Sequence, residues 1–129
     1  MADDKKLILN CIDLFNKGTL EWVDTCYSRD LEWTEFPSPG FPAGRKGGFA
    51  EFREAAFMLL LYYPDRKLGV IKCLAEKDAV MLEQEWTGTL AKTLGEHKAG
   101  EIFRLRIASV FTLKDGLIIA QNDYPTRIS

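Results

Sequence analysis

The chain has 129 residues, 47% of them hydrophobic, which is enough apolar content to build the core of one domain. Its 17 basic and 19 acidic residues give a formal net charge of -2, without the basic stripe that a nucleic-acid partner requires. The N-terminus lacks the apolar stretch of a signal peptide, and the longest apolar run, residues 55–61, is too short to span a membrane. We therefore expect a cytoplasmic protein with neither nucleic acid nor membrane as a partner.

The cysteines and the histidine give no sign of a metal site. Cys11, Cys26 and Cys73 are an odd number and lack the spacing of metal ligands. The one histidine, His97, stands in a glycine-containing stretch without a second histidine to share a metal ion. Free cysteines are common in protein cores. We predict three reduced thiols in the core, a solvated histidine, and neither a metal ion nor an organic cofactor.

Two helices are predicted at the N-terminus. Apolar residues at positions 7, 8, 11, 14 and 15 repeat with the helical period, so the first helix is expected from Asp3 or Asp4 to Gly18. The second helix is expected to follow Thr19 and to extend through Tyr27. The two helices form a hairpin whose joint apolar faces must cover another element.

The next segments predict a strand, a loop and a buried helix. Residues 31–36 alternate with period two, which places Trp33 and Glu35 on one face of a strand. Residues 37–48 are rich in proline and glycine and predict an irregular loop. Residues 49–62 predict a helix that Pro64 stops, and its apolar residues lie on nearly every side. We therefore expect most of this helix surface to be buried.

Strand patterns dominate the second half of the chain. Residues 68–74 and 79–89 predict two strands, and in the second of these Gln84 and Trp86 share the face expected to be a core or a pocket wall. Residues 93–100 predict a loop.

The last predicted element is a β-hairpin between residues 100 and 124. A loop of three residues, 114–116, would pair Ser109 with Gln121 and Ile107 with Asp123, and would place all four side chains on one apolar face. Ile118, together with Ala120 and Val110, would then lie on the opposite face. A loop of two residues would instead move Asp123 to the other face relative to Ser109, because a slip of one residue inverts the direction of every side chain.

This order of elements predicts the α+β class, with a curved antiparallel sheet packed on three N-terminal helices. A strongly bent sheet that wraps over helices leaves a cone-shaped hollow. Several short motifs also occur in the order and spacing of a known family. They are Asn16-Lys17-Gly18 followed by Trp22, Asp30-Leu31-Glu32-Trp33, Gly44 before the third helix, Tyr63-Pro64-Asp65, Trp86-Thr87-Gly88-Thr89 and Phe111-Thr112-Leu113-Lys114-Asp115-Gly116-Leu117-Ile118.

With these motifs, nearly the whole chain resembles the SnoaL-like polyketide cyclase branch of the nuclear transport factor two-like superfamily. The resemblance implies a cone-shaped fold of the cystatin-like type. It also implies a homodimer paired through the outer face of the sheet. Since this fold carries enzymes of several classes as well as plain binding modules, the resemblance is more specific for the fold than for the function.

The resemblance also implies roles for individual residues. The acid/base aspartate of the family, at the end of the last strand, falls on Asp123, and the pocket histidine of the cyclases falls on Ser109. The histidine-tryptophan pair before that aspartate falls on Gln121 and the residue after it. In the related ketosteroid isomerases the general-base carboxylate falls on Glu35, whereas the tyrosine and the second acid of the oxyanion site fall on Cys11 and Ser109.

We predict that Asp123 performs acid/base chemistry on a hydrophobic, carbonyl-bearing small molecule, because burial among apolar side chains raises the pKa of a carboxylate toward neutrality. Glu35 is the second candidate catalytic carboxylate if the first strand faces the same hollow. Gln121 and Ser109 are expected to donate hydrogen bonds to a developing enolate oxygen. The predicted substrate-binding residues are Ser109, Gln121, Trp86, Trp33, Gln84 and Ile107.

A non-catalytic interpretation stays open. Asp123 precedes Tyr124-Pro125 at a strand end, where an aspartate often only accepts hydrogen bonds from a turn. Glu35 can lie in solvent at the mouth of the hollow, and the tryptophans can simply fill the core. The protein would then be a dimeric module that binds a small apolar ligand or serves as an accessory subunit.

Overall fold

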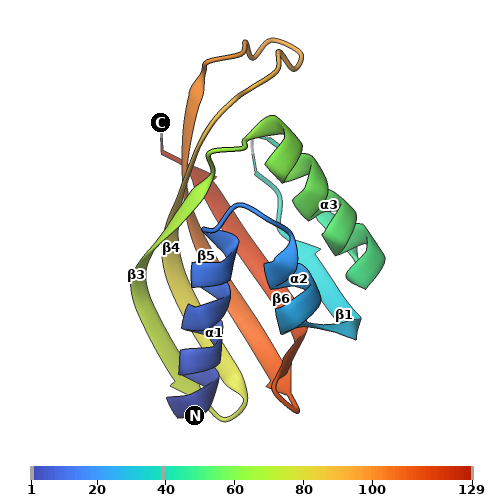
Figure 1. Ribbon diagram of the computed structural model, residues 1–129, viewed down its shortest axis with the longest axis vertical. Coiled ribbons are helices and arrows are strands. Elements are labelled where there is room, and N and C mark those ends of the chain that lie inside the picture. Colours follow the sequence, from blue (N-terminus) through green and yellow to red (C-terminus); the bar gives the residue numbers. More distant parts are fainter. Residues whose placement is uncertain (1, 39, 129) are drawn as a thin grey trace.

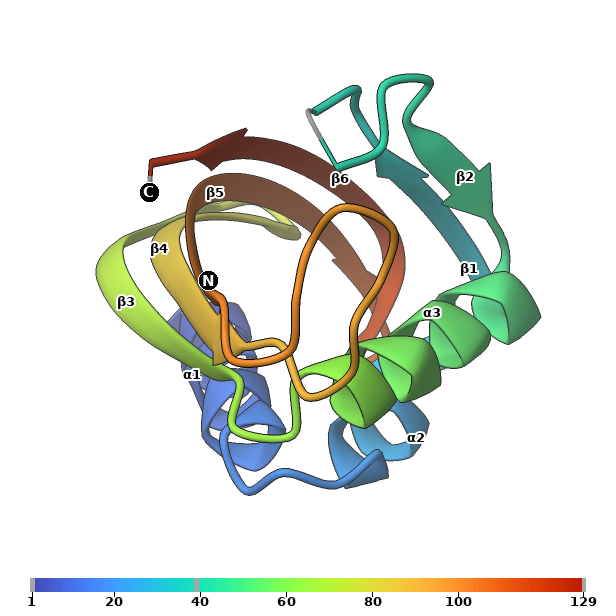
Figure 2. The same ribbon diagram turned by 90° about the horizontal axis from the view of Figure 1, so that it is seen from above.

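The computed structural model describes residues 2–38 and 40–128, and within them the chain forms three helices and one six-stranded sheet (Figure 1). The helices are α1 (Ala2–Phe15), α2 (Glu21–Cys26) and α3 (Phe49–Tyr62). The strands are β1 (Tyr27–Glu35), β2 (Arg45–Gly47), β3 (Lys67–Glu76), β4 (Ala79–Thr89), β5 (Ile102–Lys114) and β6 (Leu117–Arg127). The strand order is β2-β1-β6-β5-β4-β3, and the helices lie on the concave side of the curved sheet (Figure 2).

The α+β class and the helices packed on a curved sheet are confirmed. The sheet is mixed rather than purely antiparallel, because β1 runs parallel to β6 while the other neighbours run antiparallel. The short edge strand β2 lies within the segment 37–48 that the sequence assigns to a loop, and it pairs with the end of β1. Three residues at a sheet edge carry too little periodicity to be detected from the sequence.

The helices cover the sheet unequally. α1 contacts β3 and β4, whereas α3 contacts β1 and β2 at the other side of the curve. The prediction that most of the α3 surface is buried is wrong, because Phe57 is 50% exposed and Met58 and Leu61 are exposed as well. Only one side of α3 faces the sheet, where Phe52 and Ala56 are buried. Within the described residues no helix combines the length and the apolar character needed to cross a membrane.

Two cysteines form a disulfide, which corrects the prediction of three reduced thiols. Cys11 of α1 is bonded to Cys26, the last residue of α2, and their Cα atoms are 6.3 Å apart. Cys73 is the free cysteine among the described residues. Pairing depends on where two helices cross in space, which the spacing of cysteines along the chain does not determine.

The β5–β6 hairpin places its side chains differently from the predicted register. The loop consists of two residues, Asp115 (φ 53°) and Gly116 (φ 78°), both in the left-handed conformation that a tight hairpin requires. Ile118 therefore points into the core and is fully buried, so the prediction of Ile118 on the outer face is wrong. The register of the ladder changes between two consecutive pairs. Leu113 pairs with Ile118, but the next residue, Thr112, pairs with Ala120, so that one residue of β6 is left over.

This shift is a β-bulge with one extra residue, Ile119, in β6. Compared with the predicted three-residue loop, a two-residue loop turns every β6 side chain to the opposite face of the sheet. The extra residue in the bulge inverts the alternation once more, so the β6 side chains beyond it return to the predicted face. Asp123 is consequently paired with Ser109, and Phe111 with Gln121, all on the inner face. The predicted face of Asp123 is correct, although the predicted partners are wrong.

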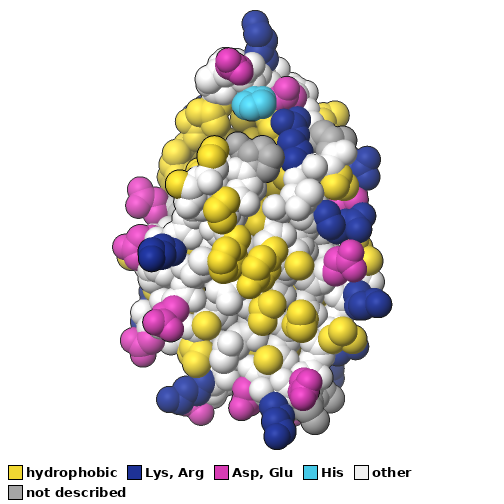
Figure 3. Space-filling view, turned by 180° about the vertical axis from the view of Figure 1, so that it is seen from behind, with side chains coloured by type: hydrophobic (Ala, Val, Ile, Leu, Met, Phe, Trp, Pro, Cys, Tyr) yellow, Lys and Arg dark blue, Asp and Glu magenta, His cyan; other side chains and the backbone are white. Residues whose placement is uncertain are grey.

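The outer face of the sheet carries apolar side chains in its middle and charged ones toward its edges (Figure 3). Leu74 and Met81 are paired across β3 and β4, and Met81 is also paired with Val110 of β5. An open hollow of about 570 Å³ lies beside them. It is lined by Glu83, Arg106, Ala108, Tyr124, Thr126 and Ile128.

Candidate active site

One row of side chains crosses the inner face of the sheet in register. It runs from Arg45 on β2 through Glu35 on β1, Asp123 on β6 and Ser109 on β5 to Leu82 on β4. Side chains on one face in adjacent strands lie about 5 Å apart, so the strand pairing alone brings two carboxylates, a cation and a hydroxyl together. The two candidate catalytic residues predicted from the sequence are therefore neighbours.

The carboxylate of Asp123 is buried, and the hydrogen bonds that it accepts from the described residues all come from neutral groups. The Ser109 hydroxyl donates to Oδ1 at 2.6 Å, and the indole N–H of Trp33 donates to Oδ2 at 3.2 Å. The Gln121 amide nitrogen contacts both carboxylate oxygens at 3.0 Å. A carboxylate has about four acceptor positions. All of them are used, and none of these partners carries a positive charge.

Two further side chains orient these donors. The Gln84 amide nitrogen donates to Ser109 Oγ at 2.9 Å, and the Tyr27 hydroxyl donates to Gln121 Oε1 at 2.5 Å. We refer to Asp123, Ser109, Gln121, Trp33, Gln84 and Tyr27 together as the Asp123 cluster. All six residues are buried, and they come from β1, β4, β5 and β6.

Burial dominates the electrostatics of the cluster. Removal of the carboxylate from water raises the pKa of Asp123 above its ordinary value. The hydrogen bonds from Ser109, Gln121 and Trp33 oppose this rise, whereas the negative charge of Glu35 adds to it. Asp123 therefore has a raised pKa, a property that distinguishes an acid/base carboxylate from a solvated one.

Glu35 is only partly buried and forms an ion pair. Arg45 Nε and Nη2 contact its two carboxylate oxygens at 2.9 and 3.2 Å. The Arg45 guanidinium also lies 3.7 Å from the centre of the Phe41 ring. Within residues 2–38 and 40–128, Glu35 thus has a cationic partner and Asp123 has none, so the two neighbouring carboxylates have different environments.

The structure does not bring every predicted binding residue into the cluster. Trp86 is on the inner face but lies four residues along β4 from Leu82, or about 13 Å from the row of Asp123. Its indole nitrogen is buried and has no hydrogen-bond partner among the described residues. Ile107 pairs with Gln84 and is partly exposed, so it lies on the inner face next to the cluster rather than within it.

The hydrogen bonds of Ser109 and Gln121 differ from the predicted ones. Ser109 and Gln121 donate to Asp123, whereas the sequence interpretation had them donate to a substrate oxygen. Tyr27 and Arg45 were not predicted at all. Tyr27 was assigned to a helix but begins β1, and Arg45 was assigned to a loop but belongs to β2. A tyrosine at the end of an apolar helical pattern gives no sign, in the sequence, of a hydrogen-bond partner 94 residues away.

The described residues offer no evident metal site. Across residues 2–38 and 40–128, His, Cys, Asp and Glu side chains nowhere form a group of three or more that could hold a metal ion. The groups that hydrogen-bond to Asp123 are the hydroxyl, amide and indole donors of Ser109, Gln121 and Trp33, and donors of this kind suit an anion or a carbonyl oxygen.

Comparison with known proteins places this arrangement in context. The sequence model of the SnoaL-like domain matches residues 8–121. Among curated proteins, none is similar enough to count as a match.

Solved structures with the same fold share little sequence. AclR from Streptomyces galilaeus, a proposed hydroxylase, has 21% identity and a TM-score of 0.82, over 97% of this chain and 79% of its own. IdmH from Streptomyces antibioticus, a proposed polyketide cyclase, has 18% identity and a TM-score of 0.78, over 95% and 91%. An epoxide hydrolase of the LEH-like type from M. tuberculosis has 14% identity and a TM-score of 0.72, over 96% and 83%. At these identities the likeness concerns the fold.

Proposed function

Since the chain belongs to the SnoaL-like domain family, we propose that it binds a small, hydrophobic, carbonyl-bearing molecule against the inner face of the sheet and that Asp123 acts on it as a general base and acid. The family alone does not name a reaction, because relatives with this fold are described as enzymes of different classes. The proposal therefore rests on the chemistry of the Asp123 cluster.

The observation that carries the proposal is a buried carboxylate without a cationic partner among the described residues. Asp123 is 9% exposed, and its hydrogen-bond donors are the neutral side chains of Ser109, Gln121 and Trp33. A salt bridge would hold the carboxylate in its charged form and make it a poor base, whereas neutral donors leave its pKa raised. A base whose pKa lies closer to neutrality both takes and returns a proton efficiently.

In the proposed reaction, Asp123 removes a proton from a carbon next to the carbonyl group of the substrate. The electron pair of that C–H bond forms the enolate, and the protonated Asp123 then returns the proton to another atom of the substrate. The longest of the contacts to the carboxylate is the one at 3.2 Å from Trp33 to Oδ2. Oδ2 is therefore the oxygen expected to accept the proton. Once Oδ2 is protonated, its hydrogen bond from the Trp33 indole N–H breaks, and that N–H can donate to the enolate oxygen instead.

A second function is favoured by a separate observation. All four acceptor positions of the Asp123 carboxylate are occupied, so a substrate proton must displace an existing hydrogen bond. If none is displaced, Asp123 only organises the wall of a binding site. The protein is then a non-catalytic module that binds a small apolar molecule.

The test uses Asp123→Asn and a probe that reports proton removal from carbon. 5-Nitrobenzisoxazole loses the proton at carbon 3 to a base, its N–O bond breaks, and the phenolate formed absorbs visible light. We expect Asp123→Asn to lower this turnover by about 10²-fold or more, the usual contribution of one positioned acid/base group. Asp115→Asn, the same chemical change at an exposed position in the β5–β6 turn, is the matched control and should leave turnover unchanged.

The outcome separates the two functions. If the folded Asp123→Asn variant retains turnover within a few-fold of the parent, Asp123 is not the base. A parent that shows no turnover above buffer, but binds 4-nitrophenol as an enolate mimic with the same affinity as Asp123→Asn, supports the non-catalytic module.

We also propose that two copies of the chain pair through the outer face of the sheet. The outer face carries exposed apolar side chains, among them Met81 and Leu74, in the middle of a surface that is charged toward its edges (Figure 3). Exposed apolar patches of this kind are usual at interfaces between protein copies.

A further inference from the structure

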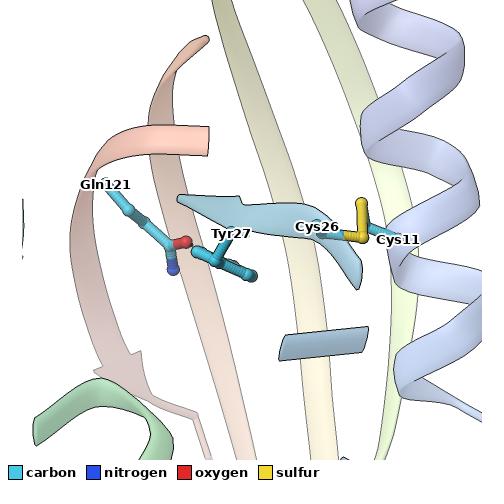
Figure 4. Close-up of a disulfide and its surroundings, with 4 residues drawn as sticks. All are labelled: Cys11, Cys26, Tyr27 and Gln121. Atoms are coloured by element: carbon cyan, nitrogen blue, oxygen red, sulfur yellow. Dashed lines mark hydrogen bonds between the residues drawn. A yellow bond between two sulfur atoms is a disulfide. The ribbon is translucent and has the colours of Figure 1, made fainter. Parts of the chain in front are cut away.

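Tyr27 contributes the one hydroxyl of the Asp123 cluster that does not touch the carboxylate. It is the first residue of β1 and directly follows Cys26, which the disulfide ties to Cys11 of α1 (Figure 4). Its ring packs 4.6 Å from Phe52 and 5.6 Å from Trp22, measured between ring centres. The backbone and the ring are therefore both held in place, and the hydroxyl is presented to Gln121.

The amide group of Gln121 can take two orientations, which differ in what they present to Asp123. In the structure Oε1 accepts the hydrogen of the Tyr27 hydroxyl, and Nε2 donates to both carboxylate oxygens. The reversed amide would place its oxygen against the carboxylate and would remove the acceptor of the Tyr27 hydroxyl hydrogen. A buried donor without a partner is unfavourable.

We propose that Tyr27 is a positioning residue of the Asp123 site, because its hydroxyl keeps the NH₂ group of Gln121 turned toward Asp123 whether or not the carboxyl group carries a proton. A protonated Asp123 has a hydrogen to donate, and a reversed Gln121 amide would offer it an acceptor. Tyr27 prevents this reversal and so favours the carboxylate, which is the form that acts as a base. The inference rests on the proposed function only for the role of Asp123 as the reacting group.

The groups around the carboxyl support this assignment. Glu35 is the charged group that faces Asp123 from β1, and Arg45 on β2 is paired with Glu35. The Phe52 ring of α3 packs against the rings of Tyr27 and Trp33, two members of the cluster. Burial and the neighbouring Asp123 carboxylate raise the pKa of Tyr27 well above its ordinary value, so the hydroxyl keeps its proton throughout the titration of Asp123.

The test is a titration of the Asp123 carboxyl carbon by ¹³C NMR in the parent and in Tyr27→Phe. Removal of the hydroxyl lets Gln121 reverse when Asp123 is protonated, so we expect the pKa of Asp123 to rise by about 1, which corresponds to the one hydrogen bond that the protonated form then gains. Tyr124→Phe removes the same atom from the residue next to Asp123, which is exposed, and should leave the titration unchanged. A Tyr27→Phe titration that coincides with that of the parent would overturn the proposal.

The same titration in a variant without the Gln121 amide shows whether Tyr27 acts through Gln121. In Gln121→Met the amide is absent, so adding Tyr27→Phe should not change the pKa of Asp123 any further. If the same rise persists, Tyr27 acts directly on the carboxyl and the proposal is wrong. These titrations need no turnover, so their result and that of the 5-nitrobenzisoxazole assay are independent.

The parent protein provides a measurement that does not depend on any substitution. If Tyr27 holds the amide, the nuclear Overhauser contacts of the two Gln121 side-chain amide protons should be the same on both sides of the Asp123 titration. Contacts from these protons to the Tyr27 ring that appear only when Asp123 is protonated would mean that the amide reverses in spite of Tyr27, and would contradict the proposal.

Discussion

At the scale of single residues, the site could be predicted in part. Asp123, Ser109 and Gln121 were expected on one face of the last hairpin and Trp33 was expected in the same site, and the four residues meet in one hydrogen-bond cluster. The periodicity of a strand defines which face a residue occupies, so these residues were accessible to sequence reasoning. Which atom a hydroxyl or an amide donates to depends also on its other hydrogen-bond partner, which is Gln84 for Ser109 and Tyr27 for Gln121. No local sequence pattern encodes that partner.

The two carboxylates illustrate the same limit. Glu35 and Asp123 were both predicted as candidates, and β1 and β6 place them side by side. Their difference comes from Arg45, which pairs with Glu35 and leaves Asp123 with neutral donors. Because Arg45 belongs to a three-residue edge strand, the residue that makes the environments of the two carboxylates different was not visible in the sequence.

At the scale of elements, two departures from the simplest hairpin cancel. The sequence interpretation assumed a three-residue loop and an unbroken ladder, whereas the structure has a two-residue loop and a bulge at Ile119. Each departure alone would turn Asp123 to the outer face, and together they keep it inside. Strand bounds were predicted well where alternation is long, as in β4, and poorly in β1, which begins at Tyr27 rather than at residue 31.

The disulfide between α1 and α2 is the element-scale feature whose loss has the most predictable effect. Cys11 and Cys26 are 15 residues apart, and a loop of this size constrains the unfolded chain by about 3 kcal/mol. We expect the double variant Cys11→Ala and Cys26→Ala to lose about that much free energy of unfolding in urea, relative to the oxidised parent. Addition of a thiol reductant should lower the free energy of unfolding of the parent and leave that of the double variant unchanged.

Thiol counting checks the premise of this prediction. The denatured, unreduced parent should contain one reactive thiol, that of Cys73. Three reactive thiols would show that the disulfide does not form in the protein as isolated. Since disulfides are rare in reducing compartments, that count also bears on the expectation of a cytoplasmic protein.

At the scale of the whole molecule, the fold was the most predictable property. The order of helices and strands identifies the α+β class, and the family match over residues 8–121 agrees with it. The parallel pairing of β1 with β6 was missed, because it joins segments about 90 residues apart and depends on how the sheet curves around the helices. The exposed side of α3 was missed for a related reason: its surroundings are set by the whole molecule and not by its own composition.

Pairing of two copies is the prediction that belongs to this scale. The mass of one chain is 14.7 kDa, and we expect light scattering at micromolar concentration to give twice that mass for the parent. The reason is that a single copy leaves the apolar side chains of the outer face exposed to solvent. Val110→Asp places a charge in the middle of that face and should give a folded monomer. Lys98→Asp, an exposed change in the loop between β4 and β5, is the control and should leave the dimer intact. A parent that is monomeric under these conditions would rule out the interface.

The measurement that most directly tests the central claim compares two titrations of the same protein. A general base acts in its deprotonated form, so the rate with 5-nitrobenzisoxazole should rise with pH through the pKa of the base. Burial raises the pKa of Asp123 above 3.8, and the midpoint of this rise should therefore lie above that value. We predict that it coincides with the midpoint of the Asp123 carboxyl carbon by ¹³C NMR. A rate that is independent of pH across the Asp123 titration, or that rises at a different pH, would contradict the account.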